Sequence, residues 1–103
     1  MSTGLSQLTS IDDPIAEDVW SYETESGTQV LARVVVGRPV PIPGDPNGDW
    51  YCPLLIDQPQ DARWLPVPGV GPVDALKNAM QVVGDAFRDA RKLGPRAKSP
   101  ATP

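Results

Sequence analysis

The chain has 103 residues, of which 40% are hydrophobic and 21% charged, and it contains no histidine and a single cysteine, Cys52. This composition is typical of one small globular domain. It lacks most of the side chains that carry acid–base, nucleophilic and metal chemistry near neutral pH. We therefore predict a non-enzymatic protein that uses no cofactor and no metal.

The cysteine count and the hydropathy pattern also bear on location. A single cysteine cannot form an internal disulfide, and no apolar run approaches the roughly 18 residues that span a bilayer. The N-terminus shows no charged segment followed by an apolar one, as a secretory signal would. We expect a cytoplasmic protein that has no contact with a membrane.

The formal net charge of −4 is unevenly distributed along the chain. Residues 1–62 hold ten acidic and two basic side chains, whereas residues 63–103 hold three acidic and seven basic ones. Nucleic-acid-binding proteins usually carry a basic stripe on the folded body, and here cations cluster only towards the C-terminus. This distribution disfavours nucleic acid as the partner, and the cations suit the end of a helix.

Both ends of the chain lack the pattern of a packed segment. Residues 1–14 are rich in Ser and Thr without periodicity, and residues 94–103 read G-P-R-A-K-S-P-A-T-P. We predict a disordered N-terminal tail over residues 1–14, a single domain over 15–93, and a disordered, basic, proline-rich tail over 94–103.

The first predicted element is a β-hairpin. Residues 19–25 and 28–36 are rich in β-branched and aromatic side chains and flank Ser26 and Gly27, which suit a two-residue turn. In this register Glu25 pairs with Thr28, so one face carries Trp20, Tyr22, Leu31 and Val35, and the other carries Val19, Val30, Ala32, Val34 and Val36. Because one helix covers only one face, we expect the other to meet a partner, a second copy or a loop.

The middle of the chain predicts a loop and two further strands. Residues 37–49 contain four prolines and three glycines, which favour an extended loop. Residues 50–57 predict a third strand, placed at an edge or bulged because Pro53 cannot donate a ladder hydrogen bond. A turn over 58–61 and a short fourth strand over 62–68 follow.

A helix is predicted from Pro72 to Leu93, since proline suits the first helical turn and Gly94 and Pro95 suit a helix end. Its apolar stripe, expected to cover the sheet, consists of Val73, Leu76, Met80, Val83, Phe87 and Ala90. Gly84 within it indicates close approach to a strand. The predicted fold class is α+β: an antiparallel sheet of three or four strands, N-terminal β-hairpin first, with one C-terminal helix packed on one face.

Two candidate chemical sites are weak. Asp45, Asn47 and Asp49 resemble the opening of a calcium loop, but Trp50 and Ile56 stand where an EF-hand needs a glycine and a carboxylate. A plain turn is the favoured interpretation. Cys52 lacks a histidine to activate it, so we expect a structural role in the sheet.

Aromatic and arginine side chains are the best candidates for a contact surface, because such residues dominate binding interfaces. Trp50 and Tyr51 are adjacent in a predicted strand and must point to opposite faces, so at least one of them lies away from the helix. The predicted partner-binding residues are Arg38, Trp50, Tyr51, Arg63, Trp64 and Tyr22.

Three short motifs follow one another along the chain: G-R-P at residues 37–39, D-W-Y-C-P at 49–53 and V-D-A-L-K-N-A-M at 73–80. Their order resembles a family of small uncharacterised bacterial single-domain proteins, with a G-[RK]-P segment, a W-x-C strand and a helix of V-x-A-L-x-x-A pattern. The chain departs from this family at Pro72 and Asp74, where members often have Asp-Ser before the valine. The resemblance implies a bacterial or phage source and a strand-rich domain followed by a helix, and it supplies no catalytic residue.

We therefore expect a small acidic protein-binding module. Its sharpest form is an immunity or inhibitor protein that masks a toxin, nuclease or other partner by electrostatic complementarity. Two alternatives are a homodimeric structural or assembly protein and a weak nucleic-acid-binding accessory protein that uses the basic C-terminus.

Overall fold

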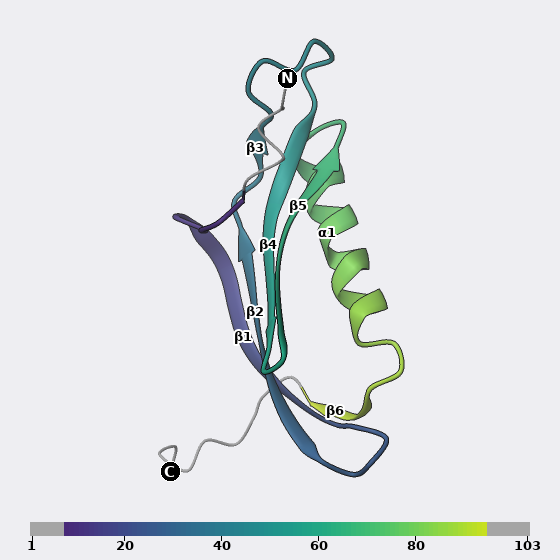
Figure 1. The fold of residues 1–103 in the computed structure, drawn as a ribbon. Helices are drawn as coiled ribbons and strands as arrows, with labels where there is room; N and C mark the ends of the chain where they lie inside the picture. The colour runs from purple at the N-terminus through teal and green to yellow at the C-terminus, as the bar shows by residue number, and fades with distance from the viewer. Residues whose placement is uncertain (1–7, 95–103) are drawn as a thin grey trace.

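The computed structural model describes residues 8–94, which form an antiparallel sheet with one helix against it (Figure 1). The elements are β1 (Pro14–Glu23), β2 (Gln29–Gly37), β3 (Val40–Pro41), β4 (Trp50–Gln58), β5 (Asp61–Gly69), α1 (Pro72–Ala86) and β6 (Arg91–Gly94). The strands lie in the order β5, β4, β2, β1, β6, and β3 pairs with β4 on the same side as β2.

The predicted α+β class is confirmed. The sheet has six strands instead of three or four, because two short strands, β3 and β6, form in segments predicted as loop and as helix. Among the described residues, no helix is long and apolar enough to cross a membrane.

The β1–β2 hairpin forms as predicted, but the predicted register is wrong by one residue. The Gly27 N–H donates to the Thr24 carbonyl, and the Thr24 N–H donates to the Thr28 carbonyl. With Gly27 at φ 87°, these bonds close a three-residue loop. Consequently Trp20 pairs with Ala32.

Side chains alternate between the two faces of a strand. The one-residue shift therefore changes which side chains of β1 share a face with which side chains of β2. The face towards the helix carries Trp20, Tyr22, Val30, Ala32, Val34 and Val36. The other face carries Val19, Leu31 and Val35.

The prolines of β4 and β5 determine where ladder hydrogen bonds form. Pro53 lies directly opposite Pro66. Neither residue has an N–H, so this is a non-hydrogen-bonded pair, and the N atoms of Pro66 and Pro68 point to the outer edge of β5. Pro53 lies in an interior strand rather than at an edge, at the point where pairing with β2 ends. Two missing donors make the β5 edge a poor template for an added strand.

Helix α1 begins at Pro72, as predicted, and the Asp74 side chain stabilises its first turn. The Val70 N–H donates to the Asp74 carboxylate at 3.0 Å, and Lys77 lies 3.4 Å away. Both interactions lower the pKa of Asp74.

The predicted extension of the helix to Leu93 is wrong. The helix ends at Ala86, and the next residue, Phe87, packs edge to face on Trp20 and Tyr22 with ring centroids 5.0 and 5.7 Å apart. Beyond this contact the chain turns and pairs with the edge of β1. Tertiary packing and strand pairing therefore override the helical pattern of the last residues.

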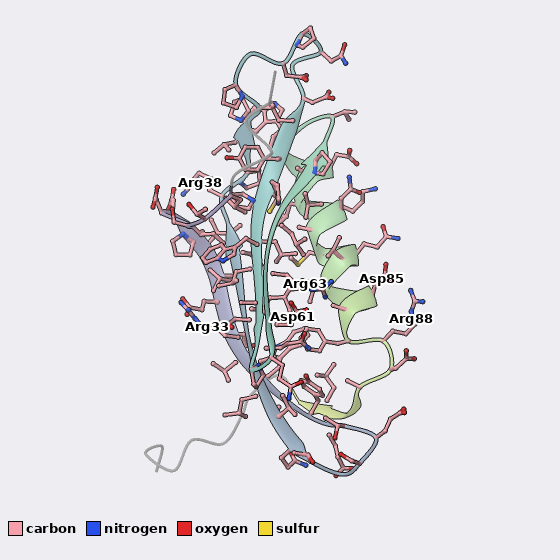
Figure 2. All side chains as sticks on the ribbon, in the orientation of Figure 1. Arg33, Arg38, Asp61, Arg63, Asp85 and Arg88 are labelled. Atoms are coloured by element: carbon pink, nitrogen blue, oxygen red, sulfur yellow. The ribbon has the colours of Figure 1, made fainter. Side chains whose placement is uncertain are left out.

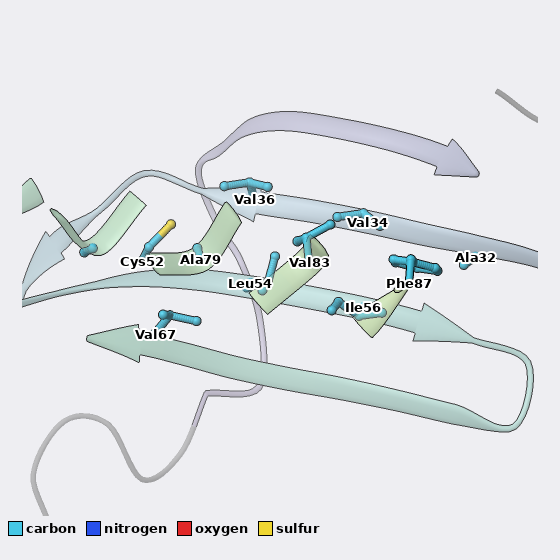
Figure 3. Close-up of a cluster of buried hydrophobic side chains, with 11 residues drawn as sticks. Ala32, Val34, Val36, Cys52, Leu54, Ile56, Val67, Ala79, Val83 and Phe87 are labelled. Atoms are coloured by element: carbon cyan, nitrogen blue, oxygen red, sulfur yellow. The ribbon is translucent and has the colours of Figure 1, made fainter. Parts of the chain in front are cut away.

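The buried face of α1 differs from the predicted stripe. Small side chains face the sheet, because Ala75 and Ala79 are fully buried while Val73 and Met80 stay exposed. This packing is close: a Cβ on Gly69 would collide with the backbone of Ala75. The core between helix and sheet (Figure 3) contains Ala32, Val34, Val36, Cys52, Leu54, Ile56, Val67, Ala75, Ala79, Val83 and Phe87.

The predicted tails fall mostly outside the described residues. Pro14 pairs with Gly37 in β1, and Gly94 pairs with Ser21 in β6, so both belong to the sheet. The Asp13 carbonyl accepts a hydrogen bond from the Arg38 N–H. The predictions of disorder over 1–7 and 95–103 concern residues that the structure does not describe.

Candidate interaction site

Within residues 8–94, no group of three or more His, Cys, Asp or Glu side chains could hold a metal ion. The Asp45 carboxylate accepts hydrogen bonds from the N–H groups of Asn47 and Asp49, at 3.1 and 2.9 Å. Gly48 follows at φ 68°. The oxygen atoms of Asp45 thus close a turn of the proline-rich loop.

Cys52 is completely buried beneath the helix. Its thiol donates to the Gly37 carbonyl, with 3.4 Å between Sγ and O. The neighbouring Pro53 has no N–H to donate to this end of β2. Burial raises the pKa of the thiol to about 11. The side chain is therefore protonated at neutral pH and acts as a packing group and weak donor.

The six residues predicted to bind a partner are divided between the two faces of the sheet. Figure 2 shows Arg63 on the helix side and Arg38 on the other side. Trp50 and Tyr22 share the helix side with Arg63, where both aromatic rings pack against the core. Tyr51, Arg38 and Trp64 share the helix-free side, which we call the open face.

The centre of the open face is an apolar row that crosses three strands. Val35 of β2 pairs with Leu55 of β4, which pairs with Trp64 of β5. Val35 and Leu55 are buried, although no helix of residues 8–94 covers this face. Three apolar side chains in or beside the row are exposed: Leu31 by 55%, Val19 by 40% and Trp64 by 38%.

Charged groups border this row. Arg33 and Glu17 form an ion pair at 2.6 Å on the open face, next to Val19 and Val35 in the register. Both side chains are about half exposed, so the pair adds little stability and can exchange partners.

A cavity of about 160 Å³ lies at the end of the open face near the start of β1. Arg38 and Tyr51 line it together with Ile11, so the structure brings two of the predicted residues together. The Arg38 Nε donates to the Asp13 carboxylate at 2.6 Å, and this hydrogen bond raises the pKa of Arg38. The N-terminal segment therefore packs on this end of the open face.

Sequence reasoning missed that Leu31 and Val19 lie on one face with Trp64. The predicted register placed Leu31 and Val19 on opposite faces. The missed signal is the E-S-G triplet at residues 25–27, because a glycine at the third loop position favours a three-residue hairpin loop.

Residues 8–90 are strongly acidic, and Arg91 and Lys92 of β6 follow them, so that residues 8–94 together carry a net charge of −6. Residues 8–90 contain all thirteen acidic residues and five of the nine basic ones, which gives a net charge of −8. Each of these five cations already forms an ion pair: Arg33 with Glu17, Arg38 with Asp13, Arg63 with Asp61, Lys77 with Asp74, and Arg88 with Asp85. A basic partner suits this surface better than an acidic one.

The first half of β1 is an edge of the described sheet, because β6 pairs with β1 only at Ser21 and Glu23. The Asp18 carboxylate accepts hydrogen bonds from the Val19 N–H at 2.9 Å and the Trp20 Nε1 at 3.1 Å. Asp18 thus binds the Val19 N–H, a donor at the sheet edge that an added strand would need for pairing.

Fold and surface together define a small acidic α+β domain with one helix in the part of the chain that the structure describes. Residues 19–94 match the family described as Domain of unknown function (DUF6968), and the chain belongs to this family. The match begins within β1 and extends through the sheet and α1 to the end of β6. Membership of a family without an assigned function agrees with the resemblance noted above. No curated protein and no solved structure matches the chain.

Proposed function

We propose that this protein is a non-enzymatic protein-binding module that uses its open face to bind a basic surface of another protein. In its sharpest form it is a cytoplasmic immunity or inhibitor protein of a bacterium or phage, which masks a toxin or nuclease. The observation that carries the proposal is the apolar row of Val35, Leu55 and Trp64, with Leu31 and Val19 exposed beside it.

The composition of this row suits a protein interface. Protein interfaces have an apolar centre with a polar rim, and tryptophan is among the residues that contribute most to binding. Here Trp64 stands at the end of the row, and the Arg33–Glu17 pair lies beside it. A partner that covers the row would bury the exposed parts of Leu31 and Trp64.

The charge supports the nature of the partner. A net charge of −8 over residues 8–90 attracts a basic surface and accelerates its association. Because the five cations of residues 8–90 are engaged in ion pairs, that part of the surface offers little to phosphate groups.

The test is affinity purification from lysate of the source cells, followed by mass spectrometry and titration with the purified partner. We expect one stoichiometric basic protein whose affinity falls at least ~10-fold with Leu31→Lys or Trp64→Ala, because each change disrupts the apolar centre. Gln81→Lys is the matched control, since it adds the same charge to Leu31→Lys on the exposed side of α1.

If Leu31→Lys and Gln81→Lys weaken binding of the partner equally, the effect is due to charge alone. This result would contradict an interface on the open face. Recovery of the bait alone, with a solution mass of two chains, would replace the proposal with a homodimer.

A further inference from the structure

The side of the sheet that carries α1 is only partly covered. The helix packs chiefly on β4 and β5, and the sheet continues beyond them with β2 and β1 (Figure 1). Four strands about 4.8 Å apart form a surface about 19 Å wide, whereas a helix with its side chains is about 10 Å wide. The uncovered half of this surface begins at β2, where Ala32, Val34 and Val36 are already buried, so its accessible part lies mainly over β1.

A groove runs along this uncovered half. It has a volume of about 270 Å³ and is lined mainly by apolar side chains: Ala16, Trp20, Val34, Val36, Met80 and Val83. We call it the α1–β1 groove. Its floor is β2, its walls are α1 and β1, and Glu17 and Asp18 also line it from β1.

The flank of α1 beside the groove is apolar but is not used by the sheet. Met80 is 44% exposed and Val73 is 78% exposed. They are seven residues apart and lie on one flank of the helix. Phe87, directly after the end of the helix, packs on Trp20 and Tyr22 of β1, so this flank is directed towards β1.

Gly84 stands four residues after Met80 on the same flank. A glycine inside a helix costs about 1 kcal/mol relative to alanine. The predicted close approach of Gly84 to a strand is wrong, because a Cβ at this position would meet no atom of a neighbouring element of residues 8–94 within 4 Å. The missing side chain leaves space for a second backbone to approach α1 closely.

We propose that the α1–β1 groove binds an amphipathic helix of a partner protein, with the apolar stripe of that helix against Ala16, Trp20 and Met80. A lysine or arginine on its flank would face Asp18, in keeping with the charge of −8 on residues 8–90. This surface is separate from the open face, so the present proposal and the proposed function can each fail alone.

The test uses the full chain labelled with ¹⁵N and a fluorescein-labelled, 18-residue peptide of leucine and lysine with a helical repeat. NMR shifts map the contact, and fluorescence anisotropy gives the affinity. We expect the largest shifts at the amides of Ala16, Trp20, Met80 and Gly84. The same peptide with glutamate in place of lysine should bind at least ~10-fold more weakly, because its charge matches that of the protein.

Two variants with an identical change separate the groove from simple charge attraction. Met80→Lys should weaken binding about tenfold because it places a charge in the apolar wall. Leu31→Lys adds the same charge on the open face and should change affinity by less than about twofold. Gly84→Leu fills the open flank without adding charge and should also weaken binding, while the amide spectrum shows that the fold is retained.

Three results would overturn the proposal: equal weakening by Met80→Lys and Leu31→Lys, shifts confined to the open face, or no binding of the lysine peptide at ~1 mM. A failure of this kind leaves the open-face test unaffected, because that test depends on Leu31 and Trp64.

Discussion

At the scale of single residues, the thiol of Cys52 gives a pH dependence whose direction can be worked out. Its pKa is 9.0 for a free side chain and about 11 in the folded protein, where burial disfavours the thiolate. Below pH 9 the thiol is protonated in both states. Between pH 9 and 11 the unfolded chain releases a proton that the folded protein retains, so the free energy of unfolding falls as pH rises.

We therefore expect the melting temperature to fall more steeply from pH 8 to pH 11 in the natural protein than in Cys52→Ala. The difference between the two proteins isolates the contribution of the thiol and is the quantity that matters. Circular dichroism during heating measures it. Parallel curves would show that the buried thiol contributes nothing to this pH dependence.

Asp18 protects the free edge of β1, and its removal should expose that edge. Asp18→Ala leaves the Val19 N–H and the Trp20 Nε1 without their acceptor. We expect a loss of about 1 kcal/mol in stability and faster self-association at high concentration. Light scattering and hydrogen exchange at the Val19 amide measure the two effects.

Glu17→Ala is the matched control for Asp18→Ala, because it removes the same charge from the neighbouring residue. The Glu17 carboxylate is instead in an exposed ion pair with Arg33 of the neighbouring strand. Self-association that increases equally in both variants would indicate an effect of net charge instead of edge protection.

At the scale of elements, two glycines beside and within α1 have opposite environments. A Cβ on Gly84 meets no atom within 4 Å, whereas a Cβ on Gly69 collides with the backbone of Ala75. We expect Gly84→Ala to stabilise the protein by about 1 kcal/mol through helix propensity. Gly69→Ala should destabilise it by about 1–3 kcal/mol because helix and strand must separate.

Urea denaturation of both variants measures these changes, and their opposite signs provide the internal control. A destabilising Gly84→Ala would contradict the open environment of Gly84 and with it one support of the α1–β1 groove.

The elements that could be predicted from sequence are those whose signals are local. The hairpin follows from β-branched residues around a glycine, and the helix start follows from Pro72. The helix end was missed because it depends on Phe87 packing against Trp20 and Tyr22 of a distant strand. The strands β3 and β6 were missed because their pairing with β4 and β1 defines them more than their own pattern does.

The surfaces were harder to predict than the elements. A register error of one residue at Gly27 placed Leu31 on the wrong face relative to Val19. The stripe of Val73 and Met80 was identified as apolar, yet sequence periodicity cannot tell a helix face that packs on its own sheet from one left for a partner.

At the scale of the whole molecule, charge repulsion should limit stability. Residues 8–90 carry thirteen acidic and five basic side chains, and the ion pairs of those cations are at the surface. Exposed ion pairs contribute at most about 1 kcal/mol each, whereas the surplus carboxylates repel one another across the domain.

Salt weakens both the attraction within the ion pairs and the repulsion between the surplus carboxylates. The direction in which the melting temperature changes therefore shows which of the two effects is larger. Raising the ionic strength from about 0.01 M to about 0.1 M shortens the screening length from about 30 Å to about 10 Å. We expect the melting temperature of the full chain to rise by several degrees, as a gain of about 1 kcal/mol would produce in a domain of this size. The double variant Glu25→Lys with Asp89→Lys changes the charge of residues 8–90 from −8 to −4 and should show a smaller rise. A melting temperature that falls with salt would mean that the surface ion pairs outweigh the repulsion, and it would remove the argument that this acidic surface is kept for a basic partner.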